Sequence, residues 1–382
     1  MRIYLDNAAT SWPKPEAVYA AADDWQRRVG AAAGRGVYRE ANETDRLIGA
    51  TRKAIAQLIG ARNPRRIVFT LNGTDALNLA LHGLVQPGEH VVTTVCEHNS
   101  VLRPLAWLRE RRDVQVTYVG CDGQGYVDPN EIRSAITPRT RLIAMVHASN
   151  VTGALQPAAE VGKIAAERGV VFLLDAAQSL GHTPIDVQQL GCQLLAAPGH
   201  KGLLGPLGMG LLYVAPGIED RLQPVRQGGT GSRSDDDQQP AELPDRYESG
   251  NLNLPGIAGL HAGVSEVLAR GAELTVHEQA LTKTLLGQLQ EIPGLTLYGP
   301  PAEAPRVGVV SFNLAGWDPQ ELATLLDTQW SLQTRAGLHC APKMHAAQGT
   351  LPAGCVRASL GPFNTEADVN ALASALREIA AS

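Results

Sequence analysis

The chain has 382 residues, of which 44% are hydrophobic and 19% are charged, so it can bury a large interior and is unlike a disordered protein. Its net charge of −5 provides no basic excess that would attract nucleic acid or an anionic membrane, which favours small-molecule chemistry. The five cysteines are odd in number and irregularly spaced, so we expect a reducing cytoplasm rather than a disulfide framework. No signal peptide or membrane-spanning run is visible, and we predict neither export nor insertion.

From residue 67 onward, short β-rich runs alternate with helical patterns. The strand-like runs are 67–70, 90–95, 114–119, 141–149 and 170–178, and the helical patterns between them are 75–84, 101–111 and 161–169. This alternation predicts right-handed crossovers and an α/β fold, with a mainly parallel sheet covered on both faces.

The pattern changes after residue 256. A long helical stretch is followed by a strand-like run at 307–314 and a last helix at 369–379, and a polar loop at 228–245 precedes the change. We predict an N-terminal arm and large domain over residues 1–255 and a smaller C-terminal α+β domain over residues 256–382.

Polar residues follow several of the predicted strands. They are Asn72-Gly73-Thr74, Ser149-Asn150, Asp175 and His200-Lys201. Ligands of open α/β sheets bind beyond the carboxyl ends of the strands, so we expect these clusters to meet in one crevice.

Gly73 and Thr74 stand between a strand and a helix, where free amides and a hydroxyl suit a phosphate. Thr74 and Asp75 are also ordinary helix-capping residues, so a capping role is an alternative. Asp175 ends a buried strand and needs a partner for its charge, such as a protonated pyridine nitrogen, although a capping or salt-bridged role is equally open. Gln178 is either a contact to a ring substituent or a polar turn residue.

Lys201 lies in the segment APGHKGLLGP, whose glycines allow a tight bend that brings a lysine amine against a ligand. It is a candidate Schiff-base former, and the alternative is a surface lysine in a glycine turn. Cys340 has Arg335 and His339 as neighbours, and positive neighbours favour the thiolate. A metal site of His339, Cys340 and His345 lacks further ligands, so no metal is predicted.

Several segments together resemble the aminotransferase class V enzymes that use pyridoxal 5'-phosphate, and among them the cysteine desulfurases. The segments that carry the resemblance are YLDNAAT, NGTDALN, CEHNSV, ASNVTG, LLDAAQS, GHKGLLGP, YESGNLNLPG, RAGLHCAP and VRASLGPFNT. The resemblance covers nearly the whole chain and implies the fold type I architecture, a homodimer and active sites at the subunit interface.

The resemblance implies a role for each matching residue around the cofactor ring. Lys201 matches the Schiff-base lysine, Asp175 the partner of the pyridinium nitrogen, and Gln178 the partner of the ring oxygen. His98, in CEHNSV, matches the histidine that stacks on the ring and shuttles protons.

Other matches concern the phosphate and the substrate. Gly73, Thr74 and His200 match phosphate-contacting positions. Asn150 matches a residue near the ring oxygen and substrate, and Arg357 matches the arginine that holds the substrate carboxylate.

Cys340 matches the nucleophilic cysteine of the group II desulfurases, whose cysteine loop is short. The implied reaction removes sulfur from L-cysteine, leaves a persulfide on Cys340 and releases L-alanine, and a sulfur-acceptor protein or a thiol then clears the persulfide. Selenocysteine lyase, acting on L-selenocysteine, and another class V aminotransferase-type enzyme are alternatives. A binding scaffold with little catalysis is a further alternative, which the intact set of reactive residues disfavours.

The sequence departs from the family pattern at three positions. Pro198 stands where a hydroxyl residue is common, and Asn251 stands where a threonine often contacts the phosphate from the partner subunit. Asn99 replaces a second histidine after His98. The phosphate contacts are therefore expected to be redistributed.

Overall fold

The computed structural model describes residues 2–34, 36–230 and 237–381, so part of the predicted loop at 228–245 lies outside the described residues. A seven-stranded sheet forms the larger part of the structure, with the strand order β2-β8-β7-β6-β5-β3-β4. Its strands are β2 (Ile67–Thr70), β3 (His90–Thr94), β4 (Gln115–Val119), β5 (Thr140–Val146), β6 (Val171–Asp175), β7 (Leu194–Pro198) and β8 (Gly210–Val214).

Adjacent strands from β4 to β7 are parallel, whereas β8 runs antiparallel to both β7 and β2. The predicted α/β fold with a mainly parallel sheet is therefore confirmed. The carboxyl ends of β5, β6 and β7 lie next to one another at one edge of the sheet.

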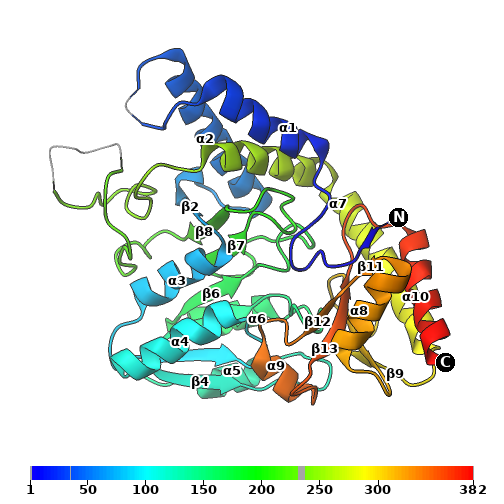
Figure 1. Ribbon diagram of the computed structural model, residues 1–382. Helices are drawn as coiled ribbons and strands as arrows, with labels where there is room; N and C mark the ends of the chain where they lie inside the picture. The colour runs from blue at the N-terminus through cyan, green and yellow to red at the C-terminus, as the bar shows by residue number, and fades with distance from the viewer. Residues whose placement is uncertain (1, 35, 231–236, 382) are drawn as a thin grey trace.

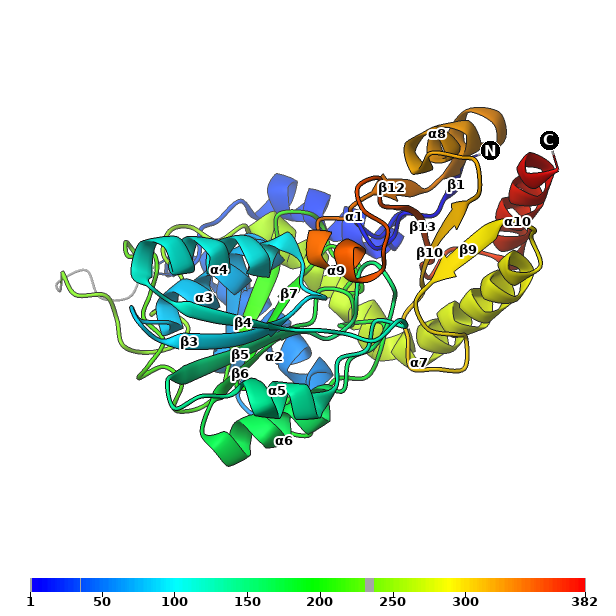
Figure 2. The ribbon, with the colours of Figure 1, turned by 90° about the horizontal axis from the view of Figure 1, so that it is seen from below.

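Helices cover both faces of this sheet. Figure 2 shows α3 (Gly73–Leu84) and α4 (Asn99–Arg112) on one face, and α5 (Pro129–Ala135) and α6 (Ala158–Arg168) on the other. Nearer the N-terminus, α1 (Glu16–Asp24) continues into the π-helical turn η1 (Trp25–Val29). It is followed by α2 (Arg39–Leu58) and the 3₁₀ turn η2 (Pro64–Arg66).

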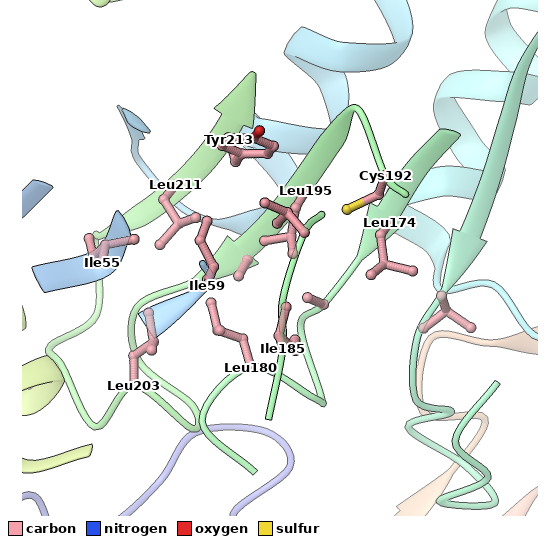
Figure 3. Packing of buried hydrophobic residues seen from close by; sticks show 14 of the residues in the cluster. Ile55, Ile59, Leu174, Leu180, Ile185, Cys192, Leu195, Leu203, Leu211 and Tyr213 are labelled. Atoms are coloured by element: carbon pink, nitrogen blue, oxygen red, sulfur yellow. The ribbon is translucent and has the colours of Figure 1, made fainter. Parts of the chain in front are cut away.

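Strand side chains alternate between two hydrophobic clusters, as the two-residue period of a strand requires. Leu195 and Leu211 belong to one cluster, whereas the next residues, Ala196 and Leu212, belong to the other. Figure 3 shows Ile59, just beyond α2, among the side chains of the first cluster. The sheet is therefore buried on both faces, which explains why its strands are continuous apolar runs.

A second, antiparallel sheet contains strands from the C-terminal third, in the order β12-β13-β10-β9. They are β9 (Leu295–Tyr298), β10 (Val309–Leu314), β12 (Arg335–Gly337) and β13 (Cys355–Ser359). The accompanying helices are α8 (Pro319–Trp330), α9 (Pro342–Ala347) and α10 (Glu366–Ala380). The N-terminal strand β1 (Ile3–Tyr4) crosses to this part of the molecule and pairs in parallel with β11 (Leu332–Gln333).

Helix α7 (Leu254–Gln290) connects the two parts of the chain. In Figure 1 it runs from beside α1 and α2 towards α10. Ile257 and Val264 pack into the core of the large sheet, whereas Leu281 and Leu285 pack into the core of the C-terminal part. Since one continuous helix serves both cores, the division between residues 255 and 256 stays a prediction. Among the described residues, no helix has both the length and the apolar character needed to cross a membrane.

Candidate active site

A cavity of about 210 Å³ lies where the carboxyl ends of the large sheet meet the C-terminal part. All ten site residues predicted from the sequence line it: Gly73, Thr74, His98, Asn150, Asp175, Gln178, His200, Lys201, Cys340 and Arg357. Residues that we did not predict as site residues also line it, among them Ser100, Arg335 and His339. The structure thus brings the predicted set together around one cavity.

Lys201 lies in a turn that directly follows β7 (Leu194–Pro198). A Cβ atom at Gly202 would lie 2.3 Å from the carbonyl oxygen of Leu180, so only glycine fits beside the segment that follows Gln178. The left-handed residue of the turn is Leu204, with a φ of 57°, and not one of the glycines. We expected the glycines to allow the bend, but Gly202 is required because two backbone segments approach closely.

The N-terminal arm packs over the same turn. The carbonyl oxygen of His200 accepts hydrogen bonds from Thr10 Oγ1 at 3.1 Å, from Ser11 N at 3.1 Å and from Lys14 Nζ at 2.7 Å. Ser11 Oγ also donates to the carbonyl oxygen of Lys201 at 3.0 Å. The arm therefore fixes the backbone on both sides of the lysine.

The carboxylate of Asp175 is buried, whereas the side chain of Lys201 is partly buried and lines the cavity. Burial lowers the pKa of Lys201 to about 8, although the charge of Asp175 acts in the opposite direction. Burial also raises the pKa of Asp175, which a hydrogen bond from the amide of Ala177 at 2.9 Å partly offsets. A partly buried amine that loses its proton near neutral pH is a suitable nucleophile for a carbonyl group.

Helix α3 points its N-terminus into the cavity. Asn72 caps the helix, its Oδ1 accepting from the amide of Asp75 at 2.9 Å, so the capping role that we left open falls to Asn72. Gly73 contacts β7 closely, since a Cβ atom there would lie 3.1 Å from Pro198 Cδ. The hydroxyls of Thr74 and Ser100 lie 2.7 Å apart. The N-terminus of α3 therefore presents polar groups to the cavity, which suits the binding of an anion.

His98 caps α4 and has a defined tautomer. Its Nδ1 accepts from the amide of Ser100 at 3.0 Å, so the ring hydrogen is on Nε2. Burial, reinforced by the charge of Lys201, lowers the pKa of His98 to about 4, and the ring is therefore neutral at pH 7. Ser100 orients His98 and contacts Thr74, and we did not identify it from the sequence because a serine after a helix cap has no distinctive pattern.

Arg357 is 2% exposed and lies on β13 (Cys355–Ser359). Its Nη2 donates to Asp6 Oδ1 at 2.6 Å, and its Nη1 donates to the carbonyl oxygen of Asn150 at 3.1 Å. Its Nε is buried without a hydrogen-bond partner. The guanidinium is thus held on one side by the N-terminal arm and retains a free donor.

Cys340 lies in a loop with an unusual backbone conformation. His339 and Cys340 have φ angles of 47° and 58°, in the left-handed region that non-glycine residues rarely adopt. Asn150 Nδ2 donates to the carbonyl oxygen of His339 at 2.6 Å, and the amide of Asn99 donates to that of Cys340 at 2.7 Å. The Cys340 loop is therefore held at the cavity by Asn150, which follows β5, and by Asn99, the first residue of α4.

Two sequence interpretations around Cys340 need correction. Burial lowers the pKa of His339 to about 2, so its ring is neutral and is not a positive neighbour of the thiol. Arg335 remains the cation of that pair and lines the cavity. The possible ligand cluster near His339 and His345 includes Cys355 and not Cys340, with all three ligand atoms within 4.8 Å of one another.

The cavity adjoins a larger and more open hollow of about 940 Å³ between α3 and α4. Both spaces share Thr74, His98, Ser100 and Cys340 as lining residues. The cavity is therefore reached from the side on which Cys340 lies.

A lysine and a buried aspartate that line one cavity at the strand ends of an open α/β sheet are an arrangement that suits a cofactor-dependent enzyme. The chain belongs to the aminotransferase class V family, which matches residues 3–372.

Within this family, the chain is similar to proteins that are named as cysteine desulfurases. The chain is 36% identical over 384 residues to a probable cysteine desulfurase of Methanothermobacter thermautotrophicus, covering 99% of this chain and 94% of that protein. It is 34% identical to a cysteine desulfurase of Pectobacterium carotovorum, covering 98% and 92% of the two chains. The apo structure of the cysteine desulfurase from Thermococcus onnurineus NA1 superposes with a TM-score of 0.93 at 34% identity, covering 100% of this chain and 95% of that one. The predicted resemblance is thereby confirmed.

Enzymes of this family depend on pyridoxal 5'-phosphate. The described residues fit that cofactor: a partly buried amine can bond to its aldehyde, a buried carboxylate can pair with its ring nitrogen, and the N-terminus of α3 can receive its phosphate. Nδ1 of His200, next to Lys201, is also buried without a partner, which leaves a polar atom free for a ligand.

Proposed function

We propose that this protein is a cysteine desulfurase that uses pyridoxal 5'-phosphate to convert L-cysteine into L-alanine and a persulfide on Cys340. The observation that supports this most strongly is that Lys201, Asp175 and Cys340 line one cavity. The lysine and aspartate suit the cofactor chemistry, whereas only sulfur transfer requires the cysteine. The names of the relatives agree with this choice.

Bound pyridoxal phosphate supplies an electron sink for a carbanion at the substrate Cα. We propose that Gly73, Thr74 and His200 hold its phosphate, that His98 packs on its ring, and that Asp175 and Gln178 contact its nitrogen and ring oxygen. In its neutral form, Lys201 Nζ removes the proton from the substrate Cα. Asn150 and Arg357 orient the substrate, and the free Nε of Arg357 provides a donor to its carboxylate.

Sulfur transfer is the task of Cys340. The Cys340 thiolate attacks the substrate sulfur, a bond forms between the two sulfur atoms, and the bond from that sulfur to the substrate Cβ breaks. The electron pair of the broken bond remains with the carbon fragment, which takes up protons and leaves as L-alanine. The thiol and L-cysteine together thus give the persulfide and L-alanine with no external oxidant.

Three further proposals accompany this function. The protein acts as a homodimer with its sites at the interface, a sulfur-acceptor protein or thiol clears the persulfide, and the enzyme works in the cytoplasm. All five cysteines are free, which suits a reducing compartment. We also propose the two-domain division at residues 255 and 256.

Cys340→Ser tests the function directly. The purified variant is expected to bind the cofactor and L-cysteine normally but to release no sulfide and to carry no persulfide. Cys121→Ser is the matched control, because Cys121 is also half-buried and free. Undiminished sulfide release by Cys340→Ser would refute the proposal. If the wild-type protein turned over L-selenocysteine but not L-cysteine, it would be a selenocysteine lyase instead.

A further inference from the structure

Two buried histidines behind the Cys340 loop form a hydrogen-bonded pair that the proposed chemistry does not use. His339 Nδ1 lies 3.3 Å from His345 Nε2, and His345 Nδ1 lies 2.7 Å from Thr350 Oγ1. On its other side, His339 Nε2 lies 3.3 Å from the carbonyl oxygen of Arg335. A chain of contacts therefore runs from Thr350 through both rings to β12.

The hydrogen positions in this chain follow from the outermost acceptor. The carbonyl of Arg335 can only accept, so His339 Nε2 carries the hydrogen and its Nδ1 has a lone pair. Burial lowers the pKa of His339 to about 2 and that of His345 to about 4, so each ring has one hydrogen. His345 must then donate from Nε2, and Thr350 must donate to His345 Nδ1.

The contacts of Thr350 agree with donation from its hydroxyl to His345. Thr350 Oγ1 is closer to His345 Nδ1, at 2.7 Å, than to the carbonyl oxygen of His345, at 3.2 Å. That carbonyl is already satisfied by the amide of Thr350 at 3.0 Å. Every hydrogen in the chain therefore has an acceptor.

The chain ends on the residue that precedes the nucleophile. His339 and Cys340 both have left-handed backbones, an unfavourable conformation for non-glycine residues that persists only where surrounding contacts impose it. The carbonyl of His339 accepts a hydrogen bond from Asn150, and that of Cys340 accepts one from the amide of Asn99. The ring of His339 is the other part of this loop that is held by hydrogen bonds. Among the described contacts, only His345 donates to its Nδ1.

We propose that His345 is a positioning residue for Cys340, which acts by donating a hydrogen bond to the ring of His339. This inference rests on the proposed function for its role in catalysis, but not for the hydrogen-bond chain itself. The ring of His345 holds the Cys340 loop in its left-handed conformation, with the thiol at the cavity. It touches neither substrate nor cofactor, so it affects sulfur attack and not substrate binding.

The activity test compares two substrates of the holoenzyme. L-Cysteine needs the thiol, whereas β-chloro-L-alanine loses chloride once its Cα proton is removed and needs no nucleophile. His345→Phe is expected to lower kcat for L-cysteine about tenfold or more, with KM and β-chloro-L-alanine elimination unchanged. His345→Gln, whose amide can still donate to His339, is expected to recover most of the loss. An equal loss on both substrates, or no loss, would overturn the proposal.

His90→Gln is the matched control, because His90 is also buried and its two ring nitrogens contact Thr140 and Thr117 away from the cavity. It is expected to leave both activities unchanged, and a selective loss of L-cysteine turnover in this control would also overturn the proposal.

A second measurement needs no activity. Nitrogen-15 NMR of the imidazoles in wild-type protein is expected to place hydrogens on Nε2 of both His339 and His345, and a hydrogen on His345 Nδ1 would contradict the chain. Stoichiometric zinc that is lost in Cys355→Ser would also contradict it, because a metal-bound nitrogen has no hydrogen. If the wild-type protein failed to release sulfide from L-cysteine, the proposed function would be refuted. The NMR result would still show whether the hydrogen bonds between Thr350, His345 and His339 exist as proposed.

Discussion

Arg357 Nη2 and Asp6 Oδ1 lie 2.6 Å apart, although 350 residues separate them in the sequence. The arginine that we assign to the substrate carboxylate thus already has one carboxylate partner. Asp6 orients the guanidinium and leaves its Nε free. The planar fork serves two partners at once, which an ammonium group cannot do.

Arg357→Lys should therefore damage catalysis more than conservation of charge would imply. We expect a loss of about 2 kcal/mol in transition-state stabilisation, or roughly 30-fold in kcat/KM for L-cysteine. The absorption spectrum of the bound cofactor should stay normal, because the arginine contacts substrate. Steady-state kinetics check this, and near wild-type efficiency would remove Arg357 from the site. Asp6→Asn should produce a smaller loss of the same kind.

Asp175→Asn tests the electrostatic role of the buried carboxylate. An amide retains the shape but cannot hold a proton on the ring nitrogen by charge, so the electron sink weakens. We expect kcat to fall on the order of 100-fold while the cofactor stays bound through its phosphate contacts. Cofactor content by absorbance and kcat by sulfide release separate the two effects. Wild-type turnover in the variant would make Asp175 a structural residue.

Lys201 should bond to the cofactor aldehyde with a pH dependence that reflects its environment. Burial lowers its pKa to about 8, so half of the amine is neutral at about pH 8, and the neutral fraction levels off roughly one pH unit higher. Cofactor addition to the apoprotein should follow this curve and not continue to rise towards pH 10.5. Stopped-flow absorbance measures the rate.

A second, partly buried lysine makes the site of addition a separate question. Lys14 also has a pKa lowered by burial to about 8, so the pH profile alone does not identify the amine. Borohydride reduction and peptide mapping do so, and the label is expected on Lys201. Lys201→Ala should yield folded protein with no label, whereas Lys14→Arg should be labelled normally. A label on any other lysine would refute the assignment.

Most of the ten candidate site residues could be collected from the sequence because they follow apolar strands, and parallel strands end at one edge of a sheet, whereas His98 and Arg357 were found only through the family resemblance. The contacts among the ten residues could not be predicted from the sequence. Asp6 reaches Arg357 because the two-residue strand β1 pairs with β11 and Asp6 itself bridges to Ser359, and strands this short have no periodicity to detect. The antiparallel direction of β8 was also invisible, since a buried strand has the same apolar run in either direction.

The role of the glycines around Lys201 shows a related limit. Their number predicted a tight turn, but the close approach of Leu180 that excludes a side chain at Gly202 depends on a different loop. Local sequence indicates where the backbone is unusual. It does not indicate which distant segment fills the space.

The buried pair of His182 and Glu278 predicts a pH effect on stability. His182 Nδ1 lies 2.7 Å from Glu278 Oε2, and Glu278 Oε1 accepts from the amide of Gly308 at 2.8 Å. The pair therefore joins the loop after Gln178 to α7 and to the start of β10. Burial by itself lowers the pKa of His182, but the charge and hydrogen bond of Glu278 outweigh it, so the pKa is raised above 6.5.

Because the folded-state pKa is raised, the pair contributes its full stability below about pH 6.5, the pKa of an unfolded histidine. This contribution is lost as pH rises through the higher folded-state pKa. We expect His182→Gln to cost about 3 kcal/mol at pH 6, since it leaves a buried carboxylate without its cation, and to cost less at pH 9. Urea unfolding of wild type and variant at both pH values measures the difference, and hydrogen exchange at the amide of Gly308 reports the same change locally. A cost that is the same at pH 6 and pH 9 would show that His182 is neutral in the folded protein throughout this range.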